Sequence, residues 1–384
     1  MLILYMQSCP ELMNNHAGRS NLNVPPAPLL NTLQAHADSK PILFHMPGHK
    51  GSIAIDAVLD VTELPFSGDL YRDTWGSDSP IRQAEALWAN DFNTKYALFL
   101  TNGATQGIQA ALYAMTTRSD TIILDECAHT AFGHVMTLLG LRAIVLPRDG
   151  GRISSVGLDK LLAAHPNCKL VCVTSPTYYG ICCDIPALAN VAHSHGTKLF
   201  VDAAHGAHFP YAGLGFPAEN ADCFVVSAHK TLRALGQSAV LFCQNDALYD
   251  TLRETTKIFG TSSPSYLLMA SLDMARFHAD THRADWQTLV LNMQNAKYGV
   301  QNDDPTRLVA PVECGEMTAK TLREHYNFWV EAYDAQHIIC IVTPGDDLAA
   351  LDALQQCNIK ATENRIKNVT HFPHSLPIHE EELL

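Results

Sequence analysis

Short apolar runs alternate with amphipathic stretches through the middle of the chain. Each run is four or five residues long and largely apolar, which predicts a strand that is buried on both faces of a sheet. The amphipathic stretches between the runs predict helices, such as those near residues 130–139 and 186–195. This alternation favours an α/β protein with a mostly parallel seven-stranded sheet between helices. The seven predicted strands are residues 97–100, 121–125, 143–146, 170–174, 198–202, 223–227 and 239–243.

The pattern changes on both sides of this region and predicts three parts. Residues 1–40 form an N-terminal arm whose proline-rich stretch excludes a regular helix. Residues 41–285 form the large domain, and residues 286–384 form a small C-terminal α+β domain. The elements predicted outside the sheet are a helix at 264–282, a strand at 337–342 and a helix near 346–357.

The composition narrows the class of protein. Hydrophobic residues make up 47% and charged residues 17% of the chain, so we expect a sizeable core. The net charge of −13 argues against nucleic acid or an anionic membrane as the main partner. The 11 cysteines are scattered through apolar runs, which predicts reduced thiols and a cytoplasmic protein. We expect no signal peptide, no membrane span and no metal site.

Lys230 directly follows a predicted buried strand, in the sequence Ser-Ala-His-Lys-Thr at residues 227–231. Burying an ammonium group there costs several kcal/mol unless the charge is paired or neutralised. An imine with a carbonyl cofactor is one way to remove that charge. A solvated lysine at the end of the strand is the alternative, and this short sequence taken alone favours it.

Asp202 ends the preceding predicted strand, 28 residues before Lys230. A carboxylate at this place can pair with the pyridine nitrogen of pyridoxal 5′-phosphate (PLP) and keep that nitrogen protonated. The protonated ring then accepts the electron pair released at the α-carbon of a substrate. The alternative is an aspartate that caps the following turn.

Two further strand ends carry residues that suit a phosphorylated ring. Gly103 allows a tight turn into a helix, and the N–H groups of Ala104 and Thr105 then form a site for a phosphate. His129 follows another strand, where its imidazole can stack on the pyridine face. Taken singly, the turn is common in α/β proteins and the histidine is more often structural.

Five segments of the chain carry a resemblance to a known family. They read FHMPGHKG (44–51), TSPTYYG (174–180), VDAAHGAH (201–208), SAHKT (227–231) and TSSPSYLLMASLD (261–273). With the four sites above, they resemble fold-type I PLP enzymes of the ornithine/lysine/arginine decarboxylase group, in particular its shorter bacterial form. The resemblance covers roughly residues 27–280 and implies a C-terminal domain that is shorter than in the longer members.

The resemblance implies a role for each site residue. Lys230 is the Schiff-base lysine, Asp202 pairs with the ring nitrogen, His129 stacks on the ring, and His205 lines it near Asp202. The family builds its site at a homodimer interface, which implies that Thr261 and Ser262 reach the cofactor of the partner. The residues implied to hold the phosphate are Ala104, Thr105, Ser227 and His229, beside the turn at Gly103.

The implied activity is decarboxylation of arginine, lysine or ornithine to the amine and CO2. Aminotransferase or aldolase chemistry is the alternative among PLP enzymes, because orientation of the substrate selects the bond that breaks. A non-catalytic paralogue that partners an active decarboxylase is the second alternative. A cationic substrate needs carboxylates near its distal end. The candidates are Glu63, Asp69, Asp73 and Asp78, although solvation at the surface is the more common role of such residues.

Overall fold

A seven-stranded sheet forms the centre of the molecule. The computed structural model describes residues 38–50, 79–295, 299–346, 348–351 and 354. Its sheet has the strand order β2-β8-β7-β6-β5-β3-β4, and all seven strands lie where the apolar runs predict them. The strands are β2 (Tyr96–Leu100), β3 (Thr121–Asp125), β4 (Arg142–Leu146), β5 (Leu170–Thr174), β6 (Lys198–Asp202), β7 (Cys223–Val226) and β8 (Ala239–Cys243).

The sheet is mostly parallel, as predicted. Strands β4, β3, β5, β6 and β7 run in one direction, whereas β8 is antiparallel to both of its neighbours, β7 and β2. In this register Asp202 lies beside Thr174 of β5 and Val225 of β7. The carboxyl ends of the central strands therefore meet at one edge of the sheet, where α/β proteins bind their ligands.

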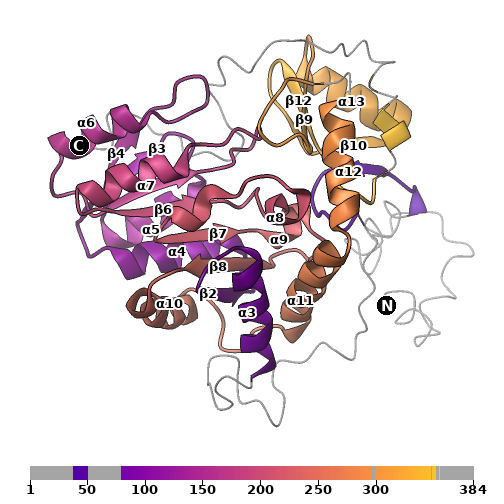
Figure 1. Ribbon diagram of the computed structural model, residues 1–384. Helices are drawn as coiled ribbons and strands as arrows, with labels where there is room; N and C mark the ends of the chain where they lie inside the picture. Colours follow the sequence, from indigo (N-terminus) through magenta and orange to yellow (C-terminus); the bar gives the residue numbers. More distant parts are fainter. Residues whose placement is uncertain (1–37, 51–78, 296–298, 347, 352–353, 355–384) are drawn as a thin grey trace, which may run out of the picture.

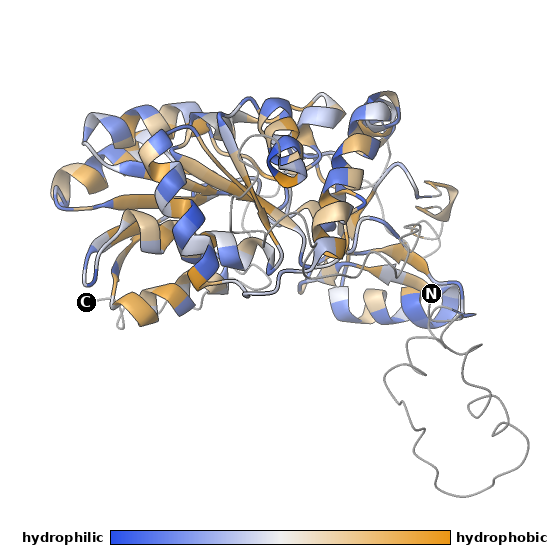
Figure 2. Cartoon of the chain, turned by 90° about the horizontal axis from the view of Figure 1, so that it is seen from below, coloured by the Kyte–Doolittle hydropathy of each residue, from blue (hydrophilic) through white to orange (hydrophobic). Residues whose placement is uncertain are grey.

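Helices cover both faces of the sheet (Figure 1). One face packs against α4 (Gly103–Met115), α5 (Thr130–Leu139) and α10 (Asp246–Ile258). The other face packs against α3 (Pro80–Asp91), α6 (Ser155–Ala164) and α7 (Ile185–Ser194). Figure 2 shows the apolar strands between helices that turn polar residues outward. This three-layer arrangement explains why the strands are apolar along their whole length.

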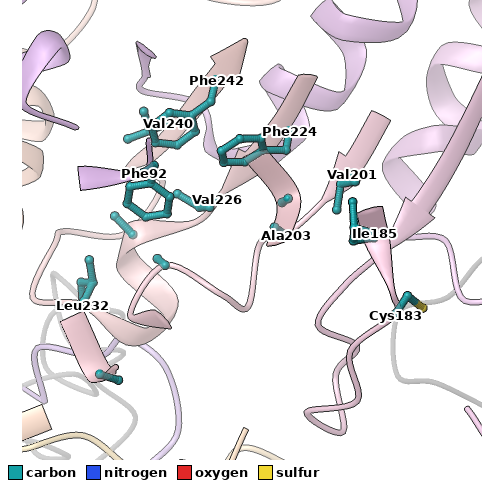
Figure 3. Packing of buried hydrophobic residues seen from close by; sticks show 14 of the residues in the cluster. Phe92, Cys183, Ile185, Val201, Ala203, Phe224, Val226, Leu232, Val240 and Phe242 are labelled. Carbon is teal, nitrogen blue, oxygen red and sulfur yellow. The ribbon is translucent and has the colours of Figure 1, made fainter. Parts of the chain in front are cut away.

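Aromatic rings fill the core on the α3 side of the sheet. Phe242 lies between Phe92 and Phe224, with ring centroids 4.7 Å from each (Figure 3). Phe92 is buried and directly follows α3, so its ring fastens that helix to strands β7 and β8.

The C-terminal part contains two small sheets and three long helices. Strand β9 pairs with β12, and β12 pairs with β11, in an antiparallel sheet. Strand β10 pairs with β1, which comes from the opposite end of the chain. In Figure 1 these elements gather at one end of the main sheet. They are β1 (Ile42–Phe44), α11 (Tyr266–Thr281), α12 (Arg283–Gln294), β9 (Arg307–Pro311), α13 (Gly315–Tyr326), β10 (Phe328–Val330), β11 (Ala332–Tyr333) and β12 (His337–Ile341).

The structure also tests the helices and the strand that were predicted outside the main sheet. The helix expected at 264–282 and the strand expected at 337–342 are α11 and β12. Of the helix expected near 346–357, the described part is a 3₁₀ turn at Leu348–Leu351, and the arm lies almost wholly outside the described residues. The nine cysteines in the described ranges are all free. None of the described helices is long and apolar enough to cross a membrane.

Candidate active site

Lys230 lies at the carboxyl edge of the sheet, on the single turn α9 (Ala228–Thr231) that directly follows β7. The buried Ser227 begins this turn, and its carbonyl accepts a hydrogen bond from the Lys230 N–H at 3.2 Å. The Nζ atom of Lys230 lies 3.1 Å from Nε2 of His205. Among the described residues, no carboxylate forms an ion pair with Lys230. The amine is thus held at the sheet edge with a neutral partner.

The surroundings of Lys230 favour its uncharged form. Burial lowers the pKa of the amine, and the charge of Arg307 lowers it further. The carboxylates of Asp202 and Glu331 act in the opposite direction without cancelling the effect. An unprotonated amine is the form that attacks a carbonyl carbon, so this site prepares Lys230 for covalent bonding.

Asp202 is the last residue of β6, the strand next to β7, and His205 lies on the loop that follows it. Asp202 is 4% exposed, and its Oδ1 accepts a hydrogen bond from the N–H of Ala204 at 3.1 Å. His205 is also buried, and the N–H of Ser227 donates to the carbonyl of Ala204 at 3.3 Å. The two strand ends are therefore tied together, which brings a carboxylate, an imidazole and an amine to one place.

His129 caps the helix that follows β3. Its Nδ1 accepts a hydrogen bond from the N–H of Ala131 at 3.1 Å, which fixes the ring at the start of α5. His129 lies just past the carboxyl end of β3, as Asp202 and His205 lie at and just past the carboxyl end of β6. The predicted stacking histidine is thus on the same edge as Lys230, three strands away in the order β3-β5-β6-β7.

The predicted phosphate turn meets α9 at one short loop. Gly103 has a φ of +72°, which glycine adopts freely, and its N–H donates to the carbonyl of Gln237 at 2.7 Å. Ser238 directly follows Gln237, and its carbonyl oxygen lies 3.1 Å from Nδ1 of His229. The N–H groups of Ala104 and Thr105 belong to the first turn of α4, where a helix offers them no internal acceptor.

Three residues at this site were not predicted. Arg307 begins β9 and is 2% exposed, and its Nη2 donates to Nδ1 of His205 at 3.1 Å. The ring of Tyr178 lies edge-on to His205 with centroids 5.0 Å apart, and its hydroxyl donates to Glu331 at 2.6 Å. Tyr178 belongs to a segment that carries the resemblance, so a signal existed for it. Nothing in the local sequence marks Arg307 or Glu331, which only the fold brings here.

Other predicted residues do not join this cluster. Thr261 and Ser262 are exposed on the loop between α10 and α11. The four acidic candidates Glu63, Asp69, Asp73 and Asp78 lie outside the described residues.

Comparison with known proteins assigns the family. A sequence model described as "Orn/Lys/Arg decarboxylase, major domain" matches residues 27–322. The chain belongs to this family. It is 28% identical to an arginine decarboxylase of Bacillus subtilis (strain 168), an alignment that covers 90% of this chain and 79% of that protein. The family match makes the protein an amino-acid decarboxylase with PLP as its cofactor.

Solved structures of other proteins share the fold of this decarboxylase family member. The constitutive lysine decarboxylase of Escherichia coli has a TM-score of 0.57 at 15% identity, over 72% of this chain and 50% of that one. The pyridoxamine-pyruvate aminotransferase of Mesorhizobium loti has a TM-score of 0.59 at 16% identity, over 72% of this chain and 82% of that one. The architecture is therefore that of fold-type I PLP enzymes, as predicted.

The described residues fit PLP. An aldehyde needs an unprotonated amine, and Lys230 has a lowered pKa and no ion-pair partner among the described carboxylates. A pyridine nitrogen that is to stay protonated needs a buried carboxylate, and Asp202 lies on the neighbouring strand. A phosphate needs N–H donors at a helix start, which α4 offers beside His229.

Proposed function

We propose that this enzyme removes the α-carboxyl group of a basic amino acid, arginine, lysine or ornithine, as CO2 and releases the corresponding amine. The observation that carries the proposal is the half-buried amine of Lys230, which forms no ion pair with any described carboxylate and follows the strand next to Asp202, in a chain of this family. Relatives named arginine decarboxylase and lysine decarboxylase support a basic substrate.

Each residue of the cluster has a defined task in this proposal. When bound, PLP supplies the electron sink for the pair that is released when the bond between the α-carbon and the carboxylate breaks. Lys230 holds the cofactor through Nζ, and Asp202 keeps the ring nitrogen protonated by its negative charge. His129 fixes the plane of the ring by stacking on it. Lys230 or a nearby histidine then delivers a proton to the α-carbon.

The phosphate is assigned to the loops around α4 and α9. The N–H groups of Ala104 and Thr105 supply donors, and Gly103 allows the turn that directs them. Ser227 and His229 complete the site, because both lie on the strand-to-helix connection that carries Lys230. Negative charge at the start of α4 is also favoured by the helix dipole.

The wider organisation is part of the proposal. Residues 41–285 form the large PLP-binding domain, between the arm at 1–40 and the small domain at 286–384. The enzyme is a homodimer in which Thr261 and Ser262 reach the cofactor of the partner, and their exposure on a loop is compatible with that role. The free cysteines suit the reducing cytoplasm.

The test is a CO2-release assay with arginine, lysine and ornithine, each labelled in the α-carboxyl group. We expect one of them to release CO2 with the wild-type enzyme, and Lys230→Ala to reduce the rate to that of free cofactor. Lys198→Ala is the matched control, because this exposed lysine begins β6, at the opposite end of that strand from the site. Borohydride reduction should attach the cofactor to the peptide that contains Lys230.

Four outcomes would contradict the proposal. A keto acid in place of CO2 would establish aminotransferase chemistry, and cleavage of a side-chain carbon bond would establish an aldolase. Cofactor on Lys230 without turnover of any basic amino acid would favour the non-catalytic paralogue. An unlabelled Lys230 would remove the basis of the assignment altogether.

A further inference from the structure

Arg307 and Lys230 lie on opposite sides of the same imidazole ring. Nη2 of Arg307 is 3.1 Å from Nδ1 of His205, and Nζ of Lys230 is 3.1 Å from Nε2. A guanidinium group has donors and no acceptor, so Nδ1 must accept its hydrogen bond. In a neutral imidazole that accepts at one nitrogen, the proton resides on the other, which is Nε2.

We infer that Arg307 is a positioning residue that fixes His205 as a neutral imidazole with its Nε2–H directed at Lys230, and that it thereby keeps the amine of Lys230 unprotonated. An Nε2–H donor requires an acceptor opposite to it. Only the neutral amine has a lone pair to accept that hydrogen bond. The inference rests on the proposed function solely in that Lys230 is the residue that binds the cofactor.

Burial and the charge of Arg307 favour a neutral His205 ring. Burial lowers the pKa of His205 far below its usual value, and the charge of Arg307 lowers it further. A doubly protonated imidazole would place the Nδ1 hydrogen against the guanidinium of Arg307, which offers no acceptor. The ring is therefore restricted to its neutral forms, and Arg307 selects between the two tautomers.

Arg307 itself is held in a way that a purely structural role does not explain. The guanidinium carbon lies 5.9 Å from the centroid of the Tyr178 ring, and the Arg307 carbonyl accepts from Asn302 at 2.7 Å. Among the described residues, Nε and Nη1 of Arg307 have no hydrogen-bond partner. In the part of the chain that the structure describes, His205 is thus the acceptor for the side chain of Arg307, which donates to it through Nη2.

The small C-terminal sheet supplies the group that contacts His205. Arg307 begins β9, and Asn302 fixes the backbone there by donating to the carbonyls of both Arg307 and Tyr179. The hydrogen bond to His205 therefore joins β9 to the loop after β6.

The experiment measures how fast the cofactor-free, full-length protein bonds covalently to added PLP at different pH values. Borohydride traps the product, and peptide mass spectrometry quantifies the label on Lys230. The variants are Arg307→Met, which can neither donate nor carry charge, and Arg307→Gln, which is neutral but can donate from its amide to Nδ1. PLP also titrates in this pH range, but it does so equally with every variant. Its titration therefore cancels when the labelling rate of one variant is divided by that of another at the same pH.

We expect Arg307→Met to move the midpoint of the pH profile upward by about one pH unit. At a pH below the midpoint, the labelling rate of this variant should then be about tenfold lower than that of the wild type. Arg307→Gln should lie clearly closer to the wild type, because it keeps the tautomer although it loses the charge. Equal shifts in the two variants would show that charge alone matters and would overturn the inference. An unchanged profile in Arg307→Met would overturn it as well.

Two controls keep the test decisive. Circular dichroism and thermal unfolding check the fold of each variant, and Arg307→Leu replaces Arg307→Met if the latter does not fold. In a His205→Ala background the difference between the Met and Gln variants should disappear. Label on Lys230 in the wild type with no difference between variants would refute only this inference, whereas an unlabelled Lys230 would refute the proposed function.

Discussion

Adding one methyl group at Gly48 should displace the turn that carries Lys230. A Cβ atom there would lie 2.6 Å from the carbonyl carbon of Thr231, 2.7 Å from its oxygen and 2.8 Å from the carbonyl oxygen of Leu232. Ordinary contacts of a Cβ begin at 3.4 Å. The two segments would therefore have to separate by about 0.8 Å, the difference between 3.4 and 2.6 Å.

The cost follows from what the methyl group meets. Overpacking a buried site costs about 1–3 kcal/mol when side chains can yield. Here all three neighbours are backbone atoms of α9 and its end, which cannot rotate away, so we expect about 3 kcal/mol. The separation also weakens the hydrogen bond from the Gly48 N–H to the His229 carbonyl, now 2.9 Å long.

Urea denaturation of Gly48→Ala beside Gly236→Ala measures the effect. Gly236 follows the same turn, is exposed, and has no atom within 4 Å of an added Cβ, so its variant should equal or slightly exceed the wild type in stability. Labelling of Lys230 by PLP should slow in Gly48→Ala alone. Unfolding free energies of the two variants within about 0.5 kcal/mol of each other would refute the reasoning.

The remaining predictions concern buried groups, each measured by urea denaturation. Burial alone would raise the pKa of Asp304, but His208 and Arg307 lower it overall. Its stabilisation is therefore complete above the unfolded-state pKa of about 3.9 and is lost as the pH falls through the lower folded-state value. Asp304→Asn should cost about 3 kcal/mol at pH 7, and the gap to the wild type should narrow below about pH 4; a gap that widens in acid would contradict this. Arg148→Met removes the partner of the fully buried carboxylate that ends β3 and should cost about 3–5 kcal/mol; a loss below about 1 kcal/mol would show that this carboxylate does not need its partner. Phe92→Ala removes the ring at one end of the stack and should cost about 3–5 kcal/mol, whereas Phe92→Leu should recover most of it.

Much of the sheet and part of the site could be predicted from local sequence. Every strand of the main sheet is a continuous apolar run, because helices exclude water from both faces. Asp202 ends such a run and Lys230 follows one shortly after, because a buried strand tolerates polar groups only at its ends. The resemblance added roles for His129 and His205, which the residue types alone leave open.

The amino-acid pattern by itself determined which segments are buried and where each strand ends, because burial leaves a periodic trace in neighbouring residues. It did not determine direction or partners, since an apolar run reads the same in both orientations. Only the tertiary structure made β8 antiparallel, paired β1 with β10, and brought Arg307 to the ring of His205, 102 positions away in the sequence. Contacts of that kind depend on the packing of whole layers, and no local pattern records them.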